Sequence, residues 1–187
     1  MAVYNGIIKG KTVQLRSLEE KDAEITFKMR NDSEKNKYLN SPPASVEAQK
    51  EYIAKQRQKP DDYYFLIEDL DGNPIGMKGF SDYKPAKHTI ESGRFMGFGN
   101  QIQNLEALLL SIDFAFDILG CERIIMTVIE NNKNMYSIQQ KIGAKETGRV
   151  YMKNFGCNSI HSELTKENYY PAREKIELLI NRFAGRK

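Results

Sequence analysis

Residues 105–129, LEALLLSIDFAFDILGCERIIMTVI, contain the pattern that decides the fold of this chain. The apolar residues of its first part are spaced so that they form one broad face of a helix. They are Leu105, Leu108, Leu109, Ile112, Ala115, Phe116 and Leu119. Gly120 follows as a C-cap, because glycine readily adopts the left-handed conformation that ends many helices. Residues 123–129 form a nearly continuous apolar run between polar turns, which predicts a strand buried on both faces.

The helix is expected to connect two strands. Residues 89–98 precede it and have the composition of a strand, so the whole segment predicts a β-α-β crossover. Such crossovers are right-handed and place their two strands side by side in parallel. Upstream, residues 63–68 and 75–83 are predicted to form an antiparallel hairpin across the turn at residues 71–74, DGNP.

Further elements are expected on both sides of this central part. Residues 12–15 alternate in hydrophobicity as a strand does, and Asp22 and Ser45 are suitable caps for two following helices. After the crossover, Asn131 or Asn132 is expected to cap another helix. Residues 148–155 and 159–164 then predict a second hairpin.

A terminal helix completes the prediction. Pro171 is expected to open it, since proline suits the first helical position, and Gly185 is expected to end it. The residues expected to face inward are Ala172, Ile176, Leu179, Ile180 and Phe183. This apolar side is consistent either with cover for a sheet edge or with contact to a second subunit, so a homodimer is one open possibility.

Together these elements predict a mixed α/β fold. A central mixed sheet of about seven strands is flanked by helices, and an extra helix lies at the C-terminus. With 187 residues, the chain is expected to form a single domain over residues 1–187. Its core spans about residues 12–167, and its helical extension spans about residues 170–184.

Composition excludes several classes of protein. Lys and Arg number 28 against 25 Asp and Glu, and this small excess does not indicate a nucleic-acid partner. The two cysteines and two histidines form no ligand pattern, so no metal site is expected. No segment approaches the roughly 18 apolar residues of a membrane span, and no signal peptide is recognisable. We therefore expect a cytoplasmic protein with no membrane partner.

Several short segments, in this order and spacing, resemble the Gcn5-related N-acetyltransferase (GNAT) family. They are residues 15–18 (LRSL), 29–32 (MRND), 73–76 (NPIG), 91–97 (ESGRFMG), 115–124 (AFDILGCERI) and 141–144 (KIGA). The resemblance covers about residues 12–170 and is closest to the branch of ribosomal-protein N-terminal and amino-sugar acetyltransferases. It implies a GNAT-like sheet, an acetyltransferase activity and acetyl-CoA as the co-substrate.

The resemblance also implies roles for individual residues. Glu91 would be the general base, although an exposed strand carboxylate would look the same. Asn132 would cap a helix and contact the pantetheine arm, and Arg30 would face the acceptor or simply stabilise a helix end. The tyrosine that often acts as general acid in this family falls at Gln139, so Tyr136, one turn earlier, is the substitute candidate.

The strand backbone at Phe95, Met96 and Gly97 would pair with the pantetheine arm. The family binds the pyrophosphate of coenzyme A in a glycine-rich loop before the long helix, where backbone N–H groups and the helix dipole attract the anion. In this chain the loop residues are Gly99, Asn100, Gln101, Ile102, Gln103 and Asn104. The two motif glycines fall at Asn100 and Ile102, and isoleucine disfavours positive φ. Either the loop follows another path or the affinity for the coenzyme is reduced.

Two hypotheses follow. The first is an acetyl-CoA-dependent N-acetyltransferase that acts on a primary amine of a small molecule, an amino sugar or a protein N-terminus by direct attack in a ternary complex. The alternative is a non-catalytic GNAT-fold binding or structural module that has lost productive coenzyme A binding. The acceptor, an acyl donor other than acetyl, the general acid and the oligomeric state all stay open.

Overall fold

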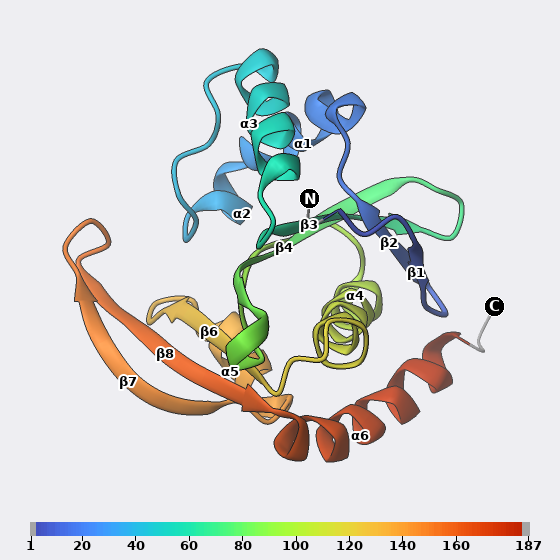
Figure 1. The fold of residues 1–187 in the computed structure, drawn as a ribbon, viewed down its shortest axis with the longest axis vertical. Coiled ribbons are helices and arrows are strands. Elements are labelled where there is room, and N and C mark those ends of the chain that lie inside the picture. The colour runs from blue at the N-terminus through green and yellow to red at the C-terminus, as the bar shows by residue number, and fades with distance from the viewer. Residues whose placement is uncertain (1–2, 185–187) are drawn as a thin grey trace.

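The computed structural model describes residues 3–184, which form an eight-stranded sheet in the order β1-β2-β3-β4-β5-β6-β8-β7 (Figure 1). The strands are β1 (Ile7–Lys9), β2 (Val13–Ser17), β3 (Tyr63–Asp69), β4 (Pro74–Lys84), β5 (Thr89–Gly97), β6 (Arg123–Ile129), β7 (Lys145–Met152) and β8 (Cys157–Thr165). Neighbouring strands pair antiparallel, except that β5 and β6 are parallel as predicted. The sheet has one strand more than expected. Sequence analysis did not predict β1, because its three residues are too few to show a hydrophobic pattern.

Helices cover both faces of the sheet. They are α1 (Ala23–Arg30), α2 (Ser33–Asn36), α3 (Val46–Gln58), α4 (Gln101–Asp113), α5 (Lys133–Lys141) and α6 (Lys166–Ala184). In Figure 1, α1 and α3 lie on one side of the sheet, whereas α4 lies on the other with α6 packed beside it. A π-helical turn, Phe114–Ile118, extends α4 toward Gly120, whose φ of +69° confirms the predicted C-cap.

The core is divided by the sheet into two apolar clusters. Along β3, Phe65 and Ile67 belong to the larger cluster with α4, whereas Tyr64 and Leu66 belong to the smaller cluster with α1 and α3. Successive strand residues point to opposite faces, so a strand covered on both sides reads as a continuous apolar run. The ring of Phe114 lies at the centre of the larger cluster, 4.9 Å from that of Phe65.

One expectation about β6 is wrong in part. Ile124, Met126 and Val128 are buried, but Ile125, Thr127 and Ile129, on the other face of the strand, are only half-buried. Two of these, Thr127 and Ile129, line a cavity that is described below, which explains why the strand is not covered on both faces.

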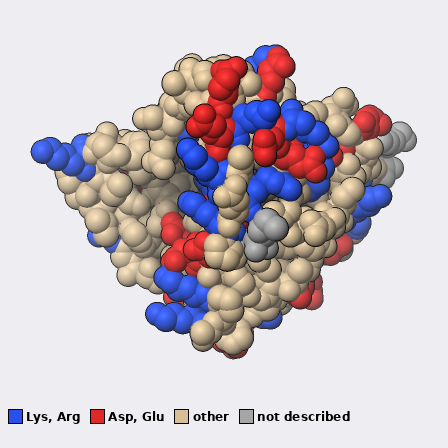
Figure 2. All heavy atoms as spheres, turned by 45° about the horizontal axis from the view of Figure 1, so that its top comes forward, with Lys and Arg blue, Asp and Glu red and all other residues tan. Residues whose placement is uncertain are grey.

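The outer surface over α1 and α3 has mixed charge. Figure 2 shows Lys and Arg interspersed with Asp and Glu on the face turned toward the viewer. Two of the ion pairs are Lys28–Glu24 in α1 and Lys55–Glu51 in α3, both exposed and one helical turn apart. Exposed pairs of this kind contribute little stability, so this face is a solvated surface of alternating sign.

The terminal helix differs from its prediction in two ways. It begins at Lys166, so Pro171 lies inside it rather than at its start. Proline has no backbone N–H, so Pro171 costs the first turns of α6 one backbone hydrogen bond. Ile180 is buried as expected, but Leu179 and Phe183 are 42% and 50% exposed. Gly185 lies outside the described residues.

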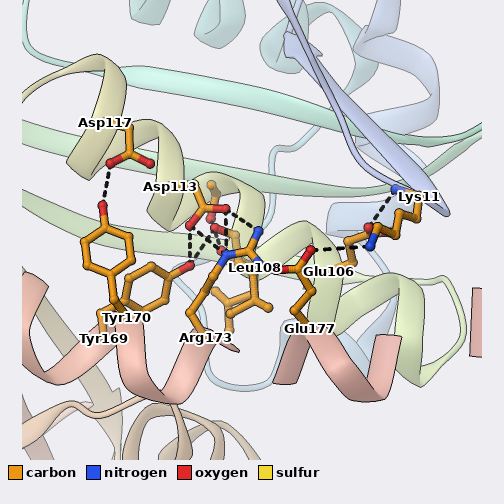
Figure 3. A network of polar contacts seen from close by, with 11 residues as sticks. Lys11, Glu106, Leu108, Asp113, Asp117, Tyr169, Tyr170, Arg173 and Glu177 are labelled. Atoms are coloured by element: carbon orange, nitrogen blue, oxygen red, sulfur yellow. Dashed lines mark hydrogen bonds and ion pairs between the residues drawn. The ribbon is translucent and has the colours of Figure 1, made fainter. Parts of the chain in front are cut away.

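Polar contacts decide how α6 is oriented (Figure 3). The Tyr169 hydroxyl donates to Asp113 Oδ1 at 2.6 Å and lies 3.1 Å from the carbonyl oxygen of Leu109. The Arg173 guanidinium donates to Asp113 Oδ2 at 2.9 Å and to Glu177 Oε2 at 2.6 Å. Glu177 in turn pairs with Lys11 at 3.3 Å. These contacts join α6 both to the end of α4 and to the β1–β2 turn.

Tyr169→Phe is expected to lower the free energy of unfolding by about 1–3 kcal/mol, because it removes a buried donor to a charged acceptor. Urea denaturation would measure the change. The matched control is Tyr170→Phe, which removes a less buried hydroxyl from Asp117 and should have a smaller effect. An equal loss in both variants would contradict the anchoring role of Tyr169.

Candidate active site

The two parallel strands of the crossover diverge within the sheet. Their ladder ends at the pair Ser92 and Met126, although β5 continues to Gly97 and β6 to Ile129. A cavity of about 720 Å³ lies at this opening. Its walls come from β4, β5, β6, α5, the segment between α1 and α3, and the end of the β7–β8 hairpin. A cavity of this size suits a small ligand.

A bulge in β5 shapes the opening. Arg94 adopts a left-handed φ of +51°, which is uncommon for a residue other than glycine. Its guanidinium forms an ion pair with the buried Asp62, donates to the Phe80 carbonyl oxygen at 2.6 Å and donates to the Tyr52 hydroxyl at 3.1 Å. Burial lowers the pKa of Arg94, but the hydrogen bond and charge of Asp62 outweigh this and raise it overall. Gly79 lies against this guanidinium, and a Cβ there would overlap with it.

A lysine lies buried beside the bulge. Lys78 is 1% exposed, and its Nζ donates to the carbonyl oxygens of Gly79 and Gly93 at 2.8 and 2.9 Å. Its third partner is Ser92 Oγ at 2.7 Å, and the ring of Phe80 covers it at 4.3 Å. Burial, together with the nearby Arg94, lowers the pKa of Lys78 well below its usual value. Burial therefore works against the charged form of this amine, whereas the three acceptor oxygens and the ring of Phe80 stabilise it.

Sequence analysis did not single out Lys78, although a signal was present. In the predicted strand, Lys78 and Phe80 are two residues apart and therefore share a face. Since Phe80 is a core residue, a lysine at the same face is a charged residue at a core position. Such residues are rare and generally have a function.

Glu91 lies beside the opening, on the face of β5 opposite to Ser92. It is half-buried, lines the cavity and lies between Ser81 of β4 and Ile125 of β6. Within residues 3–184, no hydrogen bond or ion pair engages its carboxylate. A carboxylate that lines a cavity without a partner is available to a cationic or proton-donating ligand.

The far wall carries amide side chains. Asn132 caps α5, its Oδ1 accepting from the N–H of Met135 at 3.2 Å, and it lines the cavity as expected. Gln139 also lines the cavity and is 6% exposed. Its Oε1 has no hydrogen-bond partner among the described residues. Buried polar atoms are nearly always satisfied, so this oxygen is suited to a bound ligand.

The structure does not bring Tyr136 into the cavity. Its hydroxyl donates to Glu146 Oε2 of β7 at 2.9 Å on the exposed side of α5. The hydrogen bond to Glu146 raises the pKa of Tyr136, which makes the phenol a weaker acid. Sequence spacing places Tyr136 one turn from Gln139, but only Gln139 is on the face of α5 that lines the cavity.

Arg30 lines the cavity at the end of α1. Its Nη2 donates to the carbonyl oxygens of Asn40 and Ser41 at 2.8 and 3.2 Å, so it holds the segment between α2 and α3 at the rim. The Tyr38 hydroxyl donates to the carbonyl oxygen of Asn131 at 3.1 Å. This segment therefore reaches from α1 to the start of α5.

Residues 99–104 lead directly into α4. Asn100 has a φ of −66° and caps α4: its Oδ1 accepts from the N–H of Gln103 at 3.0 Å, and Gln103 Oε1 accepts from the N–H of Asn100 at 2.9 Å. Ile102 lies in the first turn of the helix. Asn104 Nδ2 donates to the carbonyl oxygen of Gly99 at 2.8 Å. Neither Asn100 nor Ile102 adopts a positive φ, so this path needs no glycine at either position.

The predicted coenzyme residues are therefore divided between two places. Phe95 lines the main cavity, whereas Met96 and Gly97 are buried in the strand. Asn100 to Gln103 border a second hollow of about 560 Å³ beside the β1–β2 turn. No group of three His, Cys, Asp or Glu side chains that could hold a metal occurs within residues 3–184. In the same range, no helix is long and apolar enough to cross a membrane.

Asp62→Ala is expected to destabilise the fold by about 3–5 kcal/mol, because it leaves the Arg94 guanidinium without its buried counter-ion. Glu24→Ala, which removes a partner from the exposed Lys28–Glu24 pair, is the control and should change stability by less than about 1 kcal/mol. Chemical denaturation of both variants is the measurement. Equal losses would mean that the pair does not hold the bulge.

Comparisons with known proteins agree with this geometry. The family model described as an acetyltransferase (GNAT) domain matches residues 12–145. No curated protein matches the sequence closely enough to count as a relative.

Solved structures share the fold at low sequence identity. A GCN5-related N-acetyltransferase from Brucella melitensis is 17% identical, with a TM-score of 0.81 over 95% of this chain and 86% of that one. An apo nucleotide-linked sugar GNAT is 24% identical, with a TM-score of 0.79 over 97% and 100% of the two chains. A variant of the spermidine N-acetyltransferase from Vibrio cholerae is 18% identical, with a TM-score of 0.74 over 86% and 98%.

At these identities the structural neighbours establish the fold, which is the mixed α/β fold predicted from the sequence. The family model spans most of the chain and confirms the resemblance, while the ribosomal-protein or amino-sugar branch stays a prediction. The chain therefore belongs to the GNAT family and is an N-acetyltransferase.

Proposed function

We propose that the protein transfers the acetyl group of acetyl-CoA to a primary amine in the cavity between β5 and β6. The observation that carries this proposal is Glu91, an unpartnered carboxylate at the point where the two strands diverge. The acceptor would be an amine of a small molecule or amino sugar, or a protein N-terminus.

Glu91 would act as the general base, directly or through one water. An alkyl ammonium has a pKa of about 10, so it must lose a proton before its nitrogen can attack a thioester. A carboxylate without a competing partner attracts the ammonium and then accepts its proton. The amine would attack acetyl-CoA directly in a ternary complex, and the leaving thiolate would take up a proton without help from Tyr136.

The donor would lie along the opening. The unpaired edge of β5 near Phe95 suits the pantetheine arm, because this arm carries amide groups that hydrogen-bond as a neighbouring strand does. Asn132 and Gln139 on the opposite wall offer further amide partners. The Gln139 Oε1 would then gain the hydrogen bond that it lacks within the described chain.

The start of α4 would hold the pyrophosphate despite the altered loop. The Asn100 side chain accepts from Gln103, and among the described residues no hydrogen bond engages the N–H groups of Gln101 and Ile102. These two groups and the helix dipole attract an anion.

The acceptor would enter from the face that carries α1 and α3. Arg94 is paired with Asp62, whereas Arg30 bonds two backbone oxygens through Nη2 and keeps its charge at the rim. Glu91 is a carboxylate of this wall that no described residue engages. It suits the ammonium group of an amine acceptor.

Glu91→Gln is expected to lower turnover about 10²–10⁴-fold while the Kd for acetyl-CoA stays unchanged, because only proton abstraction is lost. Steady-state kinetics with a panel of amines, amino sugars and peptides, together with titration calorimetry, would measure both quantities. The control is Glu122→Gln, which alters an exposed carboxylate outside the cavity and should leave turnover unchanged.

An unchanged pH–rate profile in Glu91→Gln would remove this residue from the role of base. Absence of acetyl-CoA binding up to millimolar concentration in the unaltered protein would instead favour the non-catalytic module.

Asn100→Asp is expected to weaken binding of coenzyme A without changing the melting temperature. Aspartate caps a helix as well as asparagine does, so the fold is retained, but its charge repels the pyrophosphate. Calorimetry with coenzyme A and with pantetheine would separate the two parts of the ligand, since only coenzyme A carries the phosphates. Equal affinity of both proteins for coenzyme A would place the phosphates elsewhere.

A further inference from the structure

We propose that the acceptor is an amine that also carries an oxyanion, either a carboxylate or a phosphate group. Arg30 binds the oxyanion, and Glu91 binds the ammonium group of the same molecule. This inference rests on the proposed function, because it names the class of substrate for the same cavity. It goes beyond that function by dividing recognition of the acceptor between two side chains of opposite charge.

The charged side chains around the cavity differ in how the protein engages them. Among the described residues, they are Arg30, Lys78, Glu91 and Arg94. Arg94 is paired with the buried Asp62, and the Lys78 amine donates to three oxygen atoms. Arg30 and Glu91, in contrast, form no ion pair with any residue between 3 and 184. The protein therefore leaves one cation and one carboxylate of this cavity for a ligand.

The Arg30 guanidinium is only partly used by the protein. Its Nη2 donates to the carbonyl oxygens of Asn40 and Ser41 at 2.8 and 3.2 Å. In the described part of the chain, no acceptor engages the N–H groups of Nε and Nη1. Hydrogen bonds from a guanidinium to a carboxylate or phosphate are charge-assisted and stronger than those between neutral groups. The free N–H groups of Arg30 are therefore suited to an oxyanion.

Arg30 is held in place before a ligand arrives. It is half-buried at the end of α1, and its two backbone partners fix the guanidinium against the segment between α2 and α3. A side chain that is already ordered loses little conformational entropy when it binds a ligand. Its contacts therefore favour binding, although the same guanidinium also holds the rim.

The charge of Arg30 acts on the wall of the cavity. Burial raises the pKa of Tyr64 to about 12, and the charges of Arg94 and Arg30 oppose this rise. Tyr64 lines the same cavity as Glu91. An anionic group bound there would therefore experience the field of Arg30 in partly buried surroundings, where charges interact more strongly than in bulk water.

Arg30 and Glu91 line one cavity but do not pair with each other. The gap between two such charges can be spanned by a ligand that carries both complementary charges. An amine without an anionic group would engage Glu91 and leave Arg30 to water. A zwitterion engages both side chains, so it gains a second charge-assisted contact at a distance from the reacting nitrogen.

The first test compares amines that differ in one group. Each ω-amino carboxylate and each aminoalkyl phosphate is paired with the amino alcohol of the same chain length, over a range of lengths. At the best length, the anionic member should have a kcat/KM about 10–100-fold higher than its neutral partner, because a hydrogen bond to a charged group contributes that much. The two series, measured side by side, show which oxyanion is preferred.

Variants then assign the preference to Arg30. Arg30→Gln should lower kcat/KM of the anionic members to the level of their neutral partners, chiefly by raising KM, and should change the neutral partners little. Arg30→Lys, which keeps the charge, should regain part of the preference. Circular dichroism would establish that each variant is folded.

Two controls separate binding of the anion from the support that Arg30 gives to the rim. Tyr38→Phe removes the contact of the same segment with Asn131 but no charge, so anionic and neutral members should change alike. Lys28→Gln removes an exposed cation of α1 that pairs with Glu24, and the preference should be unchanged.

Three results would overturn the inference: equal kcat/KM for anionic and neutral members at every length, a preference that survives in Arg30→Gln, or a loss in that variant that neutral amines share equally. Calorimetry without acetyl-CoA keeps these outcomes apart from the proposed function. If the anionic amines bind through Arg30 but no amine is acetylated, the proposed function fails and the site for two charges stands. If neutral amines are acetylated and the anionic ones do not bind, only the inference fails.

Discussion

The ion pair between Arg94 and Asp62 is the interaction on which the site depends. A left-handed arginine in the middle of β5 is unfavourable in isolation, and the buried carboxylate, the Phe80 carbonyl and the Tyr52 hydroxyl compensate for it. The resulting bulge interrupts the register of β4 with β5. It lies directly after the last residue that pairs β5 with β6, at the place where the cavity opens.

The two faces of β5 carry different chemical groups beside the opening. On the side of α1 and α3, a carboxylate without a partner borders a rim held by Arg30. On the side of α4, a buried amine contacts a serine hydroxyl. The Glu91 carboxylate and the Ser92 hydroxyl belong to consecutive residues. They lie on opposite faces of the sheet because a strand alternates its side chains. β5 therefore presents the Glu91 carboxylate to one side of the opening and the Ser92 hydroxyl, which is bound by the Lys78 amine of β4, to the other.

Much of the fold was predictable because local patterns and burial agree. The helical face of residues 105–119, the C-cap at Gly120 and the following strand each follow from periodicity, and their crossover has one allowed hand. The terminal helix was less predictable, since Tyr169 and Arg173 orient it through Asp113, a contact between residues about sixty positions apart. The same limit applies to the site. The resemblance to the family singled out Glu91 and Asn132, which both line the cavity, but it did not give the direction of Tyr136 or the contact of Lys78 with Ser92.

The contacts of Lys11 have a consequence for how the chain reaches its native state. This residue, in the turn between the first two strands, pairs with Glu177 and also bonds Asn181, which are 166 and 170 positions later in the chain. Its backbone N–H is held by Glu106 of α4 at 2.7 Å. Loops that close over such separations form late, because the entropy of closure must be overcome first. The N-terminal hairpin can gain these contacts only after α6 has been synthesised, so this edge of the protein is completed late in folding.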